Sequence, residues 1–156
     1  MTVRLLIATL LAAAALPVAG AAAATKTIRV TSVTVSMSIH DVKPKGASKG
    51  DTITYRDKLV NAAAQFGRKK GAVVGSDSGK MTFTSAHAAV FHGKAILPGG
   101  TLILSGAVYS TPAGLVVPVI GGTGVYADMH GTLTVGKGKD NVPNTYRLTA
   151  AAGPVA

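Results

Sequence analysis

The chain has 156 residues and a formal net charge of +10, and its six acidic residues are all aspartates. It contains no cysteine, which excludes disulfide bonds, thiolate metal sites and a thiol nucleophile. The length suits one domain with one core, and the charge favours either contact with anionic polymers or simple solubility.

The N-terminus has the pattern of a secretory leader. Arg4 precedes an apolar run over 5–15, Pro17 interrupts it, and the alanines at 22–24 fit an A-x-A cleavage site. The run is short for a membrane span. We therefore predict a signal peptide over residues 1–24, a secreted, extracellular mature chain over 25–156, and no membrane span after cleavage.

The first half of the mature chain contains two predicted strands. Residues 27–41 alternate between polar and apolar types, which indicates a half-buried strand. Its apolar face would carry Val33, Val35, Met37 and Ile39. A basic turn over 43–50 leads to a second strand at 52–59, and residues 60–66 suit either one helical turn or a loop.

The second half reads as further short strands separated by glycine and proline turns. We expect strands at 72–75, 80–90, 101–109, 115–120, 131–135 and 145–150, with 75–79 as a turn or bulge. About eight short strands without a long helix predict an all-β sandwich or barrel. An eight-stranded barrel has an interior that is filled by side chains or holds one small ligand.

An ordered set of motifs resembles one family. LPGG at 97–100 precedes PVIGGTG at 118–124, Gly131 and Tyr146 follow, and a His-Asp pair at 40–41 stands earlier. This order is similar to the dirigent and allene oxide cyclase-like barrels, in particular to their bacterial secreted members. The resemblance implies an eight-stranded antiparallel, calycin-like β-barrel, commonly a homotrimer, with a hydrophobic cavity at one end.

The resemblance also implies a function. Such barrels bind a small hydrophobic or phenolic molecule and guide its cyclisation or isomerisation without a metal or an organic cofactor. Two alternatives remain: a barrel that binds such a molecule without catalysis, and a basic secreted protein that contacts anionic cell-envelope polymers. Few aromatic residues and no recognised nucleic-acid motif argue against nucleic acid as a partner.

The candidate site residues come partly from the resemblance and partly from strand parity. Dirigent proteins often carry a His-Asp pair at the end of the first strand, which makes Asp41 and His40 the predicted catalytic pair. Tyr55 is added because its hydroxyl would reach a ligand oxygen. A carboxyl group on an apolar strand face tends to have a raised pKa, which suits general acid–base catalysis.

Four further side chains are predicted to contact the ligand. They are Asp57, Tyr109, Tyr126 and His130. Asp57 also has a simpler interpretation as the partner of a neighbouring Arg or Lys, and the tyrosines as core or rim packing. Many plant relatives have an acidic residue where this chain has Val125, and an arginine where it has His130. The histidine spacings do not suit a metal site, so we predict none.

Overall fold

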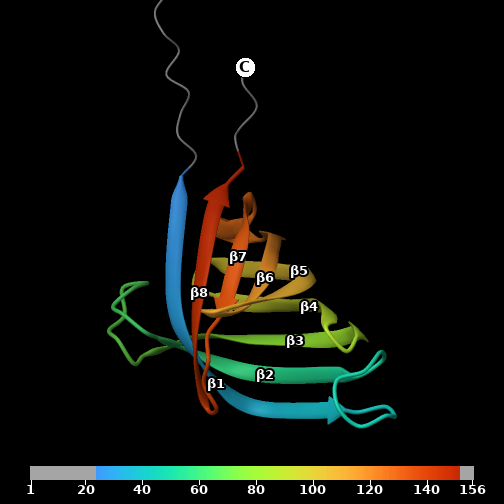
Figure 1. Ribbon diagram of the computed structural model, residues 1–156. Coiled ribbons are helices and arrows are strands. Elements are labelled where there is room, and N and C mark those ends of the chain that lie inside the picture. Colours follow the sequence, from blue (N-terminus) through green and yellow to red (C-terminus); the bar gives the residue numbers. More distant parts are fainter. Residues whose placement is uncertain (1–23, 152–156) are drawn as a thin grey trace, which may run out of the picture.

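The protein is an eight-stranded antiparallel β-barrel, as the sequence predicted (Figure 1). The computed structural model describes residues 24–151, so the predicted leader lies outside the described residues except for Ala24. The strands are β1 Thr25–His40, β2 Thr52–Asn61, β3 Val73–Ser85, β4 Ala88–Leu97, β5 Gly100–Thr111, β6 Gly114–Gly122, β7 Met129–Val135 and β8 Asn141–Ala150.

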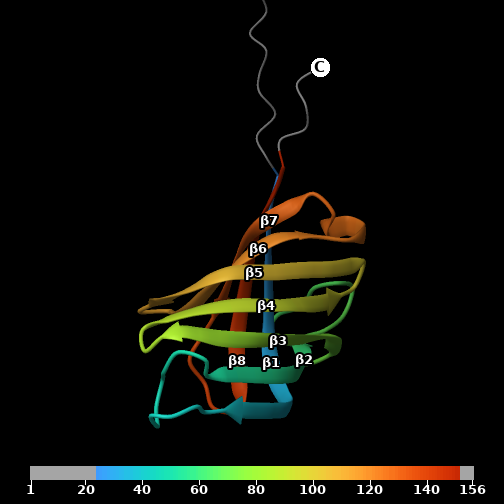
Figure 2. The same cartoon turned by 90° about the vertical axis from the view of Figure 1, so that its right-hand side faces the viewer.

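Each strand pairs with its neighbours in sequence, and β8 closes the sheet on β1. Figure 2 shows β2–β6 stacked across the front, while β8 and the first half of β1 cross behind them steeply. A single 3-10 turn, η1 Gly124–Tyr126, lies between β6 and β7. Over residues 24–151, no helix has the length and apolar character needed to cross a membrane.

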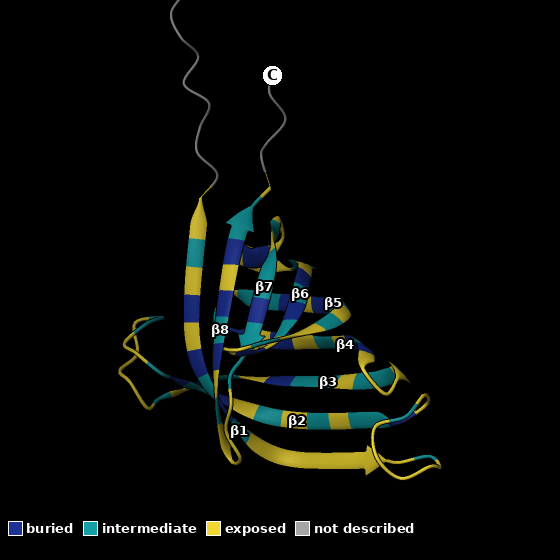
Figure 3. Cartoon of the chain, in the orientation of Figure 1, coloured by how far each residue is buried: buried dark blue, intermediate teal, exposed yellow. Residues whose placement is uncertain are grey.

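A β-bulge divides β1 into two halves that face differently. The register with β2 shifts between Thr34 and Ser36, so one residue is left over on β1. Before the bulge the even-numbered side chains point inward, with Ile28 and Val30 fully buried; after it, Met37 lines the interior. The predicted common face of Val33, Val35, Met37 and Ile39 is therefore wrong. Figure 3 shows the second half of β1 exposed along its length.

The segment 75–79 is part of a continuous strand rather than the predicted turn. β3 runs through it in register with both neighbours, and the chain reverses instead at Ala86 and His87. Gly79 lies directly opposite Gly93 of β4, and Phe91 of β4 would collide with a Cβ on either glycine. The glycines thus make room for an aromatic ring inside the barrel. Residues 62–71 form a loop, not a helical turn.

The glycine-rich signature closes one end of the barrel. Gly121 and Gly124 have positive φ, whereas Gly122 does not. Gly122 is required for space, because a Cβ there would meet the Thr101 carbonyl oxygen and Tyr126. This end is filled by buried side chains, among them Leu97, Leu102, Tyr126 and Leu148. The opposite end, which carries the β1–β2, β3–β4, β5–β6 and β7–β8 loops, is hollow.

Candidate active site

The hollow end contains a mainly apolar cavity of about 240 Å³. Strand ends from all around the barrel line it, and the β7–β8 loop contributes Gly138 and Lys139 at its mouth. The apolar lining residues are Met37, Ile53, Met81, Phe91, Val108, Leu115, Val117, Leu133, Val135 and Val142. The polar ones are Ser32, Thr34, Tyr55, Asp57, Asp77, Lys139 and Asn144. A cavity with these proportions suits a small organic ligand.

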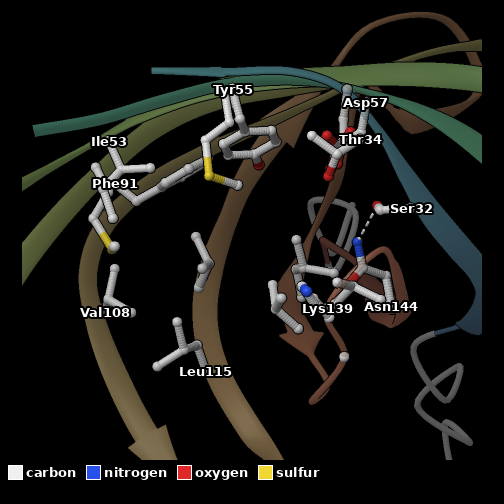
Figure 4. A pocket seen from close by; sticks show the side chains of 18 residues that line it. Ser32, Thr34, Ile53, Tyr55, Asp57, Phe91, Val108, Leu115, Lys139 and Asn144 are labelled. Atoms are coloured by element: carbon white, nitrogen blue, oxygen red, sulfur yellow. Dashed lines mark hydrogen bonds between the residues drawn. The ribbon is translucent and has the colours of Figure 1, made fainter. Parts of the chain in front are cut away.

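An aromatic wall forms one side of the cavity. Phe91 lies against Gly79 and Gly93, whose missing side chains leave its ring room on the inner face of the sheet. The rings of Phe91 and Tyr55 are stacked, with centroids 6.0 Å apart and an interplanar angle of 26°. Figure 4 shows the two side chains projecting into the same space. Stacked rings favour a flat ligand, because another ring can extend the stack.

Two carboxyl groups face each other across β2 and β3 inside the barrel. Asp57 and Asp77 are directly opposed in the strand register, and both line the cavity. Directly opposed residues of an antiparallel pair have Cβ atoms about 5 Å apart, and like charges in that position repel. The buried Oδ1 atom of each has no hydrogen-bond partner within residues 24–151. The pair is therefore poised to bind a proton or a ligand group.

Burial and mutual repulsion set the protonation of this pair. Burial, followed by the charge of Asp57, raises the pKa of Asp77 to about 7. Burial also raises the pKa of Asp57, while the hydroxyl of Thr34 beside it opposes that rise. Asp77 thus keeps its proton up to about pH 7, and because the charge of Asp57 contributes to that rise, a carboxyl acid and a carboxylate base can lie side by side in this pair.

Further polar groups lie beside the carboxyl pair. The side-chain amide of Asn144 donates to the Ser32 hydroxyl at 2.6 Å (Figure 4). In the described part of the chain, the Oδ1 of Asn144 and the buried hydroxyl of Tyr146 have no hydrogen-bond partner. Burial, followed by the charge of nearby Asp77, raises the pKa of Tyr146 well above its usual range. Within residues 24–151, no three His or Asp side chains are grouped to hold a metal ion.

The structure brings only two of the predicted site residues into the cavity. Tyr55 and Asp57 line it, and burial raises the pKa of the Tyr55 phenol. His40 and Asp41 lie at the far end of β1, where both are exposed and neither lines the cavity. The catalytic role of His40 and Asp41 stays a prediction. The candidate active site consists of other residues.

The remaining three candidates lie elsewhere. Tyr109 points away from the interior and is largely exposed, because its neighbour Val108 takes the inward position. Tyr126 is buried at the closed end, where its hydroxyl donates to the Pro98 carbonyl oxygen at 3.1 Å. His130 is exposed on β7 near the same closed end. None of the three lines the cavity.

Sequence reasoning missed Asp77. It lies in the motif Gly-Ser-Asp-Ser-Gly, which was interpreted as a turn because two glycines flank it. The alternation of residue types could have identified it, because polar residues stand between positions 77, 79, 81 and 83. If one strand continues through the glycines, Asp77 lies on the same face as Met81 and Phe83.

No protein-family model matches the sequence, and a search of curated proteins also finds no match. Solved structures do match. Pyocyanin demethylase is 25% identical, with 80% of this chain and 100% of that chain covered at a TM-score of 0.66. The pterocarpan synthase dirigent protein GePTS1 is 14% identical over 86% of this chain and 89% of its own, at a TM-score of 0.60.

The Diels–Alderase AbmU from Streptomyces koyangensis is 20% identical and has a TM-score of 0.61, and the match covers 83% of this chain and 65% of AbmU. These likenesses agree with the closed order of eight antiparallel strands. The chain therefore has the barrel fold of the dirigent and allene oxide cyclase-like proteins, the fold family that its ordered motifs predicted.

Proposed function

We propose that the barrel binds a small, flat, mainly apolar molecule in its cavity and promotes a proton-transfer isomerisation or cyclisation of it. The observation that carries this proposal is the opposed pair of Asp57 and Asp77 in an otherwise apolar cavity. Proteins of similar structure include a pyocyanin demethylase, a dirigent pterocarpan synthase and a Diels–Alderase, all of which act on organic molecules.

The proposed mechanism divides acid and base between the two carboxyl groups. Tyr55 and Phe91 hold the ring of the ligand, and the apolar walls exclude water. The ionised carboxylate removes a proton from an activated C–H or O–H group, and the protonated carboxyl group returns one elsewhere on the molecule. A pKa of about 7 at Asp77 suits proton transfer at neutral pH.

The test is α-proton exchange of 2-tetralone, a two-ring ketone, in D₂O followed by NMR. We expect the protein to accelerate exchange, and both Asp57→Asn and Asp77→Asn to lower the acceleration by about 10²-fold or more. Asp128→Asn is the control, because Asp128 is exposed outside the cavity. Equal exchange by all four proteins would contradict the proposed acid–base role.

Binding in the cavity is tested by blocking it. Val108→Trp would place a large side chain in the cavity, while Ala107→Trp on the same strand would point outward. We expect 2-naphthol, detected by its fluorescence, to lose at least tenfold in affinity for the first variant and to bind the second normally. Equal affinity for the two variants would show that the ligand binds elsewhere.

We also propose secretion and a homotrimer. The outer face of β4–β6 carries exposed apolar side chains that a partner copy would cover, namely Ile96, Ile103 and Ile120, which are 46%, 36% and 60% exposed. Light scattering at micromolar concentration should give three times the mass of the mature chain, and Ile120→Asp should lower it. A wild-type monomer would refute the trimer.

The secretion proposal is tested by the intact mass of the exported protein, which should equal the mass of a chain that begins at Thr25.

The alternative of a basic protein that contacts anionic polymers stays a prediction. The two basic loops, residues 43–49 and 68–70, adjoin opposite ends of β2 and do not form one surface. The cavity and its carboxyl pair have no role in such a contact. Binding of an anionic polysaccharide at low ionic strength that is lost in 0.5 M salt would support this alternative.

A further inference from the structure

We propose that the cavity selects ligands that carry a positively charged or strongly hydrogen-bond-donating nitrogen on a flat ring system, held between the Asp57–Asp77 pair and the Tyr55–Phe91 wall. This inference rests on the proposed function, and it names the class of molecule that the site accepts. Four features of the cavity support it.

The first feature is an excess of unsatisfied acceptors. Asp77 and Asn144 are only 5% and 4% exposed, and the Oδ1 atom of each is buried without a hydrogen-bond partner. The Oδ1 of Asp57 is in the same state. A buried acceptor without a donor is unfavourable, because it has lost its hydrogen bonds to water. A ligand that supplies N–H groups or a positive charge would satisfy these acceptors.

The second feature is the sign of the charge inside the barrel. Among residues 24–151, Asp57 and Asp77 are the acidic groups that line the cavity, and Lys139 at its mouth is the basic one. Lys139 is exposed to solvent, so its charge is screened there. A chain with net charge +10 thus has an acidic cavity inside a basic exterior. An anionic ligand that entered the cavity would be repelled by the buried carboxylates.

The third feature is the aromatic wall next to the carboxyl pair. Tyr55 precedes Asp57 by two residues on β2, so both project from the same face, and Phe91 stacks on Tyr55. Aromatic faces attract cations, and the attraction strengthens when both groups are removed from water. A carboxyl pair and two stacked rings therefore complement a cation that is itself part of an aromatic ring.

The fourth feature is size. The cavity volume of about 240 Å³ limits the ligand to a molecule of about two or three fused rings. The glycines at 79 and 93 keep the wall flat, because a side chain on either would displace Phe91. The ligand class that fits all four features is a two- or three-ring nitrogen heteroaromatic cation, or an aromatic amine of that size.

The test compares three probes of the same shape by isothermal titration calorimetry at pH 8: N-methylquinolinium, 1-methylnaphthalene and 1-naphthoate. We expect the cation to bind at least tenfold tighter than the neutral hydrocarbon, and the anion to bind least. The double variant Asp57→Asn, Asp77→Asn should remove the preference for the cation and retain binding of the hydrocarbon. Lys139→Met should strengthen cation binding, because it removes a like charge.

The pH dependence supplies a second readout, because N-methylquinolinium carries its charge at every pH. The titratable groups that face or adjoin the pair are Tyr55, Tyr146 and Lys139. Burial raises the pKa of both tyrosines, so the two phenols stay protonated between pH 5 and pH 8. Cation affinity should fall severalfold from pH 8 to pH 5 as the carboxyl pair takes up protons, while 1-methylnaphthalene affinity should not change.

The outcomes separate this inference from the proposed function. If 2-naphthol and 1-methylnaphthalene bind and N-methylquinolinium binds no tighter, the charge preference is overturned and the cavity proposal stands. If no probe of any charge binds to the wild-type protein, the proposed function fails and the ligand class fails with it. A cation preference that persists in the double Asn variant would also overturn the inference, because the charge would then come from other residues.

Discussion

Asp77→Asn is expected to stabilise the protein at pH 8 and to have little effect at pH 4. In the folded chain Asp77 holds its proton up to a pKa of about 7, compared with an ordinary value of 3.8. The unfolded chain releases that proton near pH 4. Between these values the folded state binds more protons than the unfolded state, so its stability falls as the pH rises.

The size of the effect follows from the shift. About three pKa units correspond to roughly 4 kcal/mol at full titration, which is an upper limit because denatured chains and solvent relaxation reduce it. Between pH 4 and pH 8, the melting temperature of the wild type should therefore fall by on the order of 10 °C more than that of the variant, for a barrel of this size. Asparagine fills the same space and carries no charge at any pH.

The measurement is a series of thermal melts from pH 4 to pH 8 for the wild type, Asp77→Asn and a control. Asp140→Asn is the control, because Asp140 is exposed in the β7–β8 loop. The control should reproduce the wild-type slope. If Asp77→Asn and the wild type melt in parallel over the whole range, Asp77 does not carry a raised pKa and the acid–base assignment loses its basis.

Gly124→Ala is expected to destabilise the protein far more than Gly67→Ala. Both glycines have nearly the same left-handed backbone, with φ of +61° at Gly124 and +66° at Gly67. A Cβ at Gly67 would meet no atom within 4 Å, whereas a Cβ at Gly124 would fall on the Gly99 carbonyl oxygen. The two variants thus share the conformational cost and differ in the steric one.

We expect about 1 kcal/mol for Gly67→Ala from the backbone conformation alone, and at least about 3 kcal/mol for Gly124→Ala. Urea denaturation of both variants gives the two values under one set of conditions. The Gly124 variant must displace the β4–β5 turn, because Gly99 lies in it and accepts a hydrogen bond from Val125 at 3.0 Å. Equal losses would mean that this contact relaxes without cost.

The strand pattern was predictable from the chain because the evidence for it is local, in short apolar runs and the turns between them. Alternation alone left a sandwich and a barrel open. The ordered motifs favoured the barrel, in which each strand pairs with its sequence neighbours, although the GGTG segment lies at the closed end and not at the ligand end. Gly121 and Gly124 have the positive φ that was expected of this segment, while Gly122 is needed for space beside Thr101.

The site was less predictable because it depends on register. The leftover residue at the β1 bulge changes which side chains face inward, so Val33, which precedes the bulge, does not share a face with Met37, which follows it. Tyr55 and Asp57 both line the cavity because β2 is regular between them, and their roles toward a ligand stay predictions. Asp77 was missed because its flanking glycines have the composition of a turn.

The sequence by itself determined the strand pattern and the absence of thiol chemistry, because these follow from period-two alternation and from composition, and its ordered motifs predicted the barrel fold. Only the tertiary structure decided which carboxyl groups meet. Asp57 and Asp77 are 20 positions apart, and the register of β2 on β3 places them opposite each other inside the barrel. The raised pKa of Asp77, which burial and then the charge of Asp57 produce, and the ligand class inferred for the cavity both depend on that placement inside the barrel.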